Sequence, residues 1–163
     1  NDNSISDEGL TSLSQEGLSN YRINFAYQVT KEIQLKSRVE FTRYNIGNGQ
    51  NEDGLLLYQD IRFKKLSFPL SLTLRYALFS TDSYNSRIYA YENDVLYAFS
   101  IPAFNGRGTR FYITTKYRIR RGVDLWLRFA QTYYSDRTSI GTGRDEITGN
   151  TRSEIKAQLR LKF

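Results

Sequence analysis

The 163-residue sequence contains no cysteine, no histidine and no methionine. Without cysteine the chain can form no disulfide and has no thiolate nucleophile. Without histidine it cannot assemble a serine–histidine–aspartate triad. We therefore expect no enzymatic activity, no catalytic residues, no cofactor and no bound metal. The lack of methionine, together with an opening stretch that has neither the charged nor the apolar region of a signal peptide, predicts a processed product or a fragment.

Long apolar runs are also missing. No segment approaches the roughly 18 consecutive apolar residues that a spanning helix needs, and the mean hydropathy is -0.57. These two features exclude a helical membrane protein. A transmembrane β-barrel is not excluded, because half of every strand in such a barrel faces water and keeps the mean hydropathy low.

Tyrosine and phenylalanine are abundant, with 13 and 10 copies, and aromatic side chains are favoured on β-strands. The last nine residues show a period of two, which is the side-chain period of a strand. One parity is apolar throughout and the other is polar throughout. The apolar set is Ile155, Ala157, Leu159, Leu161 and Phe163, and the polar set is Lys156, Gln158, Arg160 and Lys162. A strand with one face in lipid and the other in a wet lumen has this pattern.

The same alternation recurs along the chain. It predicts strands over residues 20–29, 32–44, 54–64, 68–79, 109–119 and 123–134, besides the terminal strand. Residues 87–101 keep one parity and form either one long strand or two short strands with a turn at 92–94. The total is therefore eight or nine strands, and eight is favoured. Residues 1–18 are polar without periodicity and are expected to form a leading loop or tail, so that the strands occupy 19–163.

Strand length separates a membrane barrel from a soluble one. About 11 residues, at ~3.3 Å each and a tilt near 40°, rise roughly 28 Å, close to the ~25 Å apolar band of outer-membrane barrels. Soluble strands usually have about five or six residues. We predict an all-β fold, an antiparallel transmembrane β-barrel of meandering strands, which forms part of a larger barrel. The alternative is a soluble lipocalin-like barrel with its apolar face turned inward.

The polar parity carries many basic residues, which would line the lumen. Two interpretations are open: a cross-strand ladder of charge pairs that holds the wall together, or a net positive interior that concentrates anions. The acidic candidates are Glu40, Asp60, Glu92, Asp94, Asp124 and Glu154. The basic candidates are Lys36, Arg38, Arg62, Arg75, Arg110, Lys116, Arg118, Arg128, Lys156 and Arg160.

Three stretches in the second half of the chain form a further pattern. They are Arg87-Ile-Tyr-Ala-Tyr-Glu-Asn-Asp-Val-Leu-Tyr-Ala-Phe-Ser-Ile-Pro, then Asn105-Gly-Arg-Gly with Arg110-Phe-Tyr, and Gly149-Asn-Thr-Arg-Ser-Glu-Ile-Lys-Ala-Gln-Leu-Arg-Leu-Lys-Phe163. Together they resemble the C-terminal barrel of outer-membrane proteins from Bacteroidetes-type bacteria that carry helix-hairpin-helix repeats upstream. The terminal Leu159, Leu161 and Phe163 also resemble the signal that the barrel assembly machinery reads. The resemblance implies the outer membrane of a Gram-negative bacterium, and by family analogy alone a link to nucleic acid.

We therefore expect a non-enzymatic, porin-like integral outer-membrane protein, the C-terminal wall of a larger barrel that serves transport or anchors a complex. The alternative is a complete eight-stranded barrel with a structural or surface-binding role, because eight strands leave an interior that side chains fill. The expected partners are outer-membrane lipid and lipopolysaccharide, the barrel assembly machinery, and other outer-membrane or periplasmic subunits.

Overall fold

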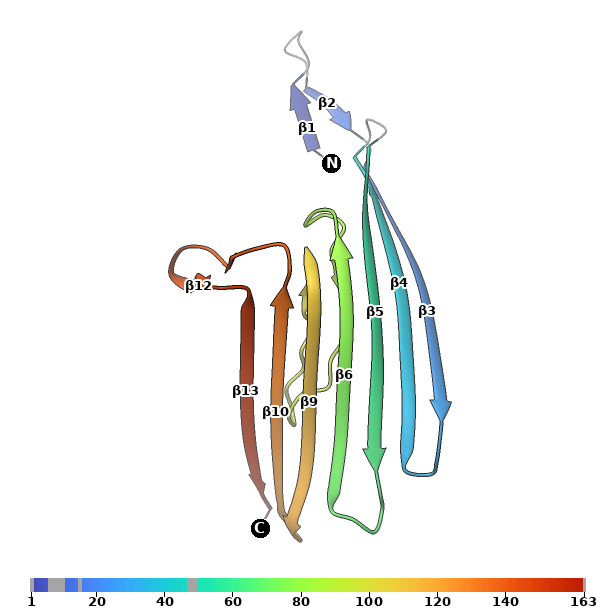
Figure 1. Ribbon diagram of the computed structural model, residues 1–163, viewed down its shortest axis with the longest axis vertical. Coiled ribbons are helices and arrows are strands. Elements are labelled where there is room, and N and C mark those ends of the chain that lie inside the picture. Colours follow the sequence, from blue (N-terminus) through green and yellow to red (C-terminus); the bar gives the residue numbers. More distant parts are fainter. Residues whose placement is uncertain (1, 6–10, 15, 47–49, 163) are drawn as a thin grey trace.

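A computed structural model of the chain describes residues 2–5, 11–14, 16–46 and 50–162. Its main body is one antiparallel sheet in the order β13-β10-β9-β6-β5-β4-β3 (Figure 1). The seven strands are β3 (Gly17–Gln28), β4 (Ile33–Asn45), β5 (Asn51–Lys64), β6 (Leu70–Thr81), β9 (Arg107–Arg120), β10 (Val123–Tyr134) and β13 (Thr151–Leu161). The predicted all-β, antiparallel and meandering arrangement is confirmed.

The register explains how the alternation becomes two chemically different faces. Apolar residues pair with apolar residues across neighbouring strands, for example Ile23 with Val39 and Leu125 with Leu159. Polar residues pair likewise, for example Arg22 with Glu40. A slip by one residue would place every side chain on the opposite face. We call the two sides of the sheet the apolar face and the polar face.

Short turns join the strands at one end of the sheet, and the longest connections, residues 82–106 and 135–150, lie at the other (Figure 1). The tightest turn joins β9 to β10, where Gly122 has a φ of 83°. This left-handed conformation is easy for glycine and costly for residues with a Cβ. The carbonyl of Gly122 accepts a hydrogen bond of 2.8 Å from the Lys162 amide, so the same turn also fixes the end of the chain's last strand.

The sheet is open. β3 and β13 lie at its two edges and do not pair with each other (Figure 1). Among the described residues, each of these two edge strands therefore has no strand partner on its outer side. An edge of this kind offers a row of N–H and C=O groups to a further strand.

The prediction that residues 87–101 cross the sheet as one or two strands is wrong. β6 pairs directly with β9, and the connecting residues 82–106 leave the sheet and return to it at the same end. Within them, β7 (Ile88–Tyr89) pairs with β8 (Ala103–Phe104), and Glu92 forms a bridge with Ser100. The alternation arises because one side of this hairpin packs on the sheet while the other is exposed. Among the described residues the main sheet has seven strands, instead of the eight or nine that were predicted.

One further expectation needs correction. Residues 1–18 were expected to form a loop or tail, but β1 (Asp2–Ile5) pairs with β2 (Thr11–Ser14), and β3 already begins at Gly17. The connection between β10 and β13 also contains paired strands, β11 (Ser139–Ile140) and β12 (Ile147–Thr148), around a short 3₁₀ turn at Gly143–Asp145. Polar turn-rich sequences can pair locally as short hairpins, which a two-residue period does not reveal at this length.

Candidate functional site: a loop inserted on the polar face

The connection formed by residues 82–106, here called the inserted loop, lies on the polar face behind β6, β9 and β10 (Figure 1). A turn at its tip is closed by a hydrogen bond of 3.1 Å from the Ala98 amide to the Val95 carbonyl. Tyr97, in this turn, has a φ of 63°, which is uncommon for a bulky residue. Ile88, Ala90 and Glu92 are buried, so the loop packs on the sheet along its even-numbered side.

Glu92 is the centre of the contact between the inserted loop and the sheet. Its carboxylate accepts two hydrogen bonds from Arg110, of 2.7 and 2.9 Å, and one of 2.5 Å from Arg128. The Glu92 side chain is 0% exposed. A buried carboxylate that accepts from two guanidinium groups is held by charge-assisted bonds, which are roughly twice as strong as neutral ones.

Asp94 makes the second ionic contact. Its carboxylate accepts a hydrogen bond of 2.6 Å from Lys156 on β13 and one of 2.8 Å from the Val95 amide. Burial alone would raise the pKa of Asp94. The hydrogen bonds from Lys156 and Val95, together with the charges of Arg128 and Lys156, outweigh burial and lower that pKa below its usual value. Asp94 is therefore held in its charged form.

Backbone groups of the inserted loop are also bonded to the sheet. Arg75 donates a hydrogen bond of 2.7 Å to the Tyr91 carbonyl. The Asn93 carbonyl accepts from the Thr114 hydroxyl at 3.0 Å and from Arg128 at 3.2 Å. These contacts satisfy polar backbone groups that lie away from regular strands, as buried backbone requires.

Arg75 also forms a buried pair within the sheet. It donates to both carboxylate oxygens of Asp60, at 2.5 and 2.8 Å, and its guanidinium lies 3.6 Å from the centre of the Tyr58 ring. The middle of the polar face is therefore balanced in charge. Its cations are Arg75, Arg110, Arg128 and Lys156, and its carboxylates are Asp60, Glu92, Asp94 and Glu154.

The short-turn end of the polar face is different, because cations predominate there. Five of the predicted basic residues lie toward that end: Lys36, Arg62, Lys116, Arg118 and Arg160. Within the described parts of the chain, Asp124 is the one carboxylate that contacts any of them, at 3.5 Å from Arg118 and also bonded to Arg160. A hollow of about 400 Å³ at this end is lined by Lys64, Lys65, Lys116 and Arg118.

The structure thus brings four of the ten predicted basic residues into the balanced group of charges in the middle of the polar face, here called the central network. It pairs Arg38 with Glu40 at 3.4 Å, and it leaves the other five near the short turns. Residue patterns did not single out Tyr112 or Thr114, which are ordinary positions of β9 until the inserted loop covers them. Nor did they single out Asn93 of that loop, whose backbone bonds to both. Leu159 and Leu161 of the proposed assembly signal lie on the apolar face and are exposed. Phe163 lies outside the described residues.

Comparison with family models, with curated proteins and with solved structures finds nothing that matches this chain. The resemblance to outer-membrane proteins with helix-hairpin-helix repeats therefore stays a hypothesis. In the described residues no helix is long and apolar enough to cross a membrane. The same residues contain no group of three or more carboxylates placed to hold a metal ion.

Proposed function

We propose that this chain is a non-enzymatic wall of a larger outer-membrane β-barrel that serves transport or anchors a complex. One observation carries the proposal: in the middle of the sheet the polar face is buried and the apolar face is exposed. Tyr76, Leu78 and Leu127 are 49%, 45% and 47% exposed, whereas Asp60, Arg75 and Arg128 are at most 2% exposed. A soluble sheet does the opposite, since burial of apolar surface is what stabilises it in water.

Strand length supports the same proposal. The seven strands have between 11 and 14 residues. At ~3.3 Å per residue and a tilt near 40°, they rise roughly 28 to 35 Å, enough to cross the ~25 Å apolar band of a barrel wall. Lipid would then cover the apolar face. The inserted loop would occupy the lumen and narrow it.

The two open edges favour a larger barrel. Backbone groups that lie unpaired in lipid cost several kcal/mol each, so an open sheet edge is not tolerated in a membrane. We propose that β3 and β13 pair with further strands that close the wall. The cations at the short-turn end of the polar face would then line one mouth of the lumen, where basic residues favour anionic solutes.

The proposal about faces can be tested with single cysteines, because the chain contains none of its own. Cysteine would replace Leu159 in one variant and Gln158 in a second, matched one. Each would carry an environment-sensitive dye, and the closed barrel, with the strands that complete its wall, would be placed in lipid vesicles. We expect brominated acyl chains to quench the dye at 159 and a water-soluble quencher to quench it at 158. Equal access of the water-soluble quencher to both positions would refute the lipid-facing assignment.

The proposal about closure has a separate test. The 163-residue chain would be refolded alone in detergent, and its gel migration would be compared before and after heating. We expect no heat-dependent shift and no protease-resistant core, because the seven strands do not close. A compact, protease-resistant monomer would instead support a complete small barrel.

A further inference from the structure

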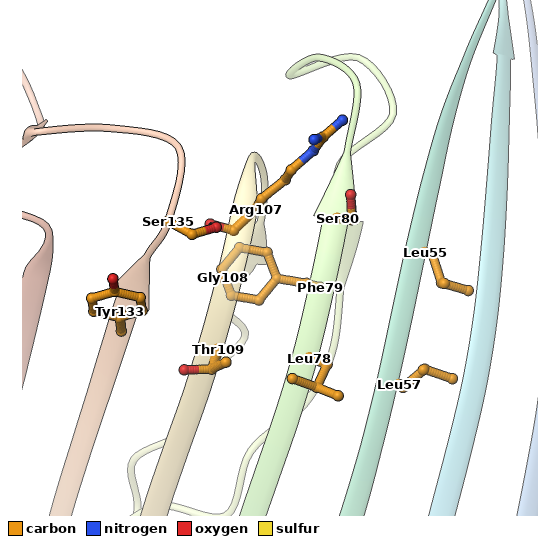
Figure 2. Close-up of a pocket in the computed structure, with 10 residues that line it drawn as sticks. All are labelled: Leu55, Leu57, Leu78, Phe79, Ser80, Arg107, Gly108, Thr109, Tyr133 and Ser135. Carbon is orange, nitrogen blue, oxygen red and sulfur yellow. The ribbon is translucent and has the colours of Figure 1, made fainter.

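A second site lies on the apolar face, near the end of the sheet that carries the long connections (Figure 2). It is a hollow of about 290 Å³ that extends across β5, β6, β9 and β10. The lining residues are Leu55, Leu57, Leu78, Phe79, Ser80, Arg107, Gly108, Thr109, Tyr133 and Ser135. Ligand pockets in proteins start at about 300 Å³, so this hollow has room for one extended chain rather than for a whole lipid.

The hollow exists because small residues lie between large ones. Ser80 and Thr109 lie on the apolar face between leucines on one side and Tyr133 on the other (Figure 2). Gly108 lets β9 approach β10 closely, since a Cβ there would lie 2.1 Å from the Tyr133 carbonyl oxygen and 3.0 Å from the Phe79 ring. The close backbone approach at Gly108 is therefore one of the features that form the depression.

Its floor is rigid. The Phe79 ring lies against Phe104 of the inserted loop, with ring centres 5.3 Å apart, and against Tyr134, at 5.7 Å. Both contacts are edge-to-face, the arrangement that aromatic rings prefer. If the Phe79 ring rotated into the hollow, it would lose its contacts with Phe104 and Tyr134 on the polar side of the sheet.

A positively charged side chain, Arg107, lies at the edge of the hollow. The Arg107 side chain is exposed and extends toward the long connections (Figure 2). In the described part of the chain no carboxylate pairs with its guanidinium. The nearby Asp136 carboxylate accepts instead from the Arg107 amide at 2.9 Å and from Arg137 at 3.0 Å. Ser135 donates its amide to the Arg107 carbonyl at 2.9 Å, so the backbone under this cation is fixed on both sides.

We propose that the hollow seats one acyl chain of lipid A, the phosphorylated and acylated anchor of lipopolysaccharide, with Arg107 binding a lipid A phosphate. This inference rests on the proposed function, which places the apolar face in lipid. Long connections lie on the outer side of such barrels, so the hollow would face the outer leaflet. The apolar floor suits a hydrocarbon chain, and a guanidinium binds phosphate by charge-assisted hydrogen bonds.

The test measures lipid A uptake by the closed barrel, purified with the strands that complete its wall and placed in phosphatidylcholine nanodiscs that contain a small fraction of lipid A. Bound lipid A would be counted by native mass spectrometry after release into mild detergent. Arg107→Gln removes the charge, and Thr109→Phe fills the hollow. Their matched controls are Arg120→Gln at the opposite end of β9 and Thr115→Phe, farther along the apolar side of the same strand.

We expect Arg107→Gln to lower uptake by about tenfold, which is the effect of losing one charge-assisted hydrogen bond to phosphate. Thr109→Phe should abolish uptake, and both controls should bind like the unchanged chain. Normal insertion with unchanged uptake in both test variants would overturn the lipid A site and leave the proposed function standing. Equal uptake of phosphatidylglycerol would also overturn it. Absence of the unchanged protein from the membrane fraction of cells would refute the proposed function itself.

Discussion

Replacing Glu92 by alanine tests whether the inserted loop is held by its buried carboxylate. The substitution removes three charge-assisted hydrogen bonds and leaves the guanidinium groups of Arg110 and Arg128 buried without their main partner. Breaking a buried ion pair in this way costs about 3 to 5 kcal/mol. Arg110 would keep its bond of 2.6 Å to Thr132, and Arg128 would keep its bond to the Asn93 carbonyl. We therefore expect the low end of the range, about 3 kcal/mol.

The loss of stability should be confined to the inserted loop and should leave the sheet unchanged. The strands on either side, β6 and β9, remain paired with each other in the variant. Local opening of residues 88–104 should become easier by about 3 kcal/mol, which corresponds to a roughly hundredfold loss of amide protection at a factor of ten for each 1.4 kcal/mol. The amides of β9 and β10 should keep their protection.

Hydrogen exchange followed by mass spectrometry of the closed barrel in detergent, purified with the strands that complete its wall, measures this difference directly. Glu92→Gln, which keeps the shape and one acceptor, should give a smaller loss than Glu92→Ala. Glu146→Gln is the matched control, since that residue is exposed in the connection between β10 and β13. Unchanged protection of residues 88–104 in Glu92→Ala would show that the carboxylate does not hold the loop. An equal loss across β9 and β10 would refute a local role.

Three further predictions concern other parts of the chain. Leu159→Arg should cost about 2 to 4 kcal/mol in urea unfolding from vesicles because it puts a charge into lipid, whereas Gln158→Arg should have little effect; equal effects would contradict the face assignment. Deleting Phe163 should lower the amount of assembled protein in cells, as quantified in outer-membrane fractions, because the residue resembles the assembly signal; normal assembly would remove this prediction. Because the pKa of Asp94 is lowered in the folded protein, its ionised carboxylate stabilises the inserted loop fully above the ordinary carboxyl pKa of about 3.9, and this stabilisation is lost as pH falls through the folded value. The protection of the loop's amides against hydrogen exchange should therefore drop below about pH 4. Lys156→Gln should shift that drop to higher pH.

Strands and faces could be predicted from sequence because both depend on a local property. A run such as Leu125, Leu127 and Phe129 alternating with Trp126 and Arg128 indicates a two-faced strand without knowledge of its neighbours. The predicted bounds of 123–134 coincide with β10 (Val123–Tyr134). The other strands differ from their predicted ranges by up to four residues at their ends, because alternation does not mark where strand pairing begins or stops.

The inserted loop could not be predicted from alternation, because an extended chain alternates whether it pairs in the main sheet or lies on top of it. Ile88, Ala90 and Glu92 share one side in either case. What distinguishes the two arrangements is long-range: β6 pairs with β9, and Glu92 meets arginines that are 18 and 36 residues away in sequence. One local signal was available. Glu92 and Asp94 are acidic residues close together in a chain whose polar parity is mainly basic.

The central network also bears on whether the inserted loop could act as a gate. Arg75, Arg110 and Arg128 are buried, and each donates a hydrogen bond to a carbonyl or a carboxylate of the loop. Withdrawal of the loop would leave three guanidinium groups in the wall without these partners, a cost that grows with each unpaired charge. If the wall is part of a barrel, the loop is thus a fixed constriction. Solutes would pass along its other side, where Tyr97 and Phe99 are 88% and 75% exposed.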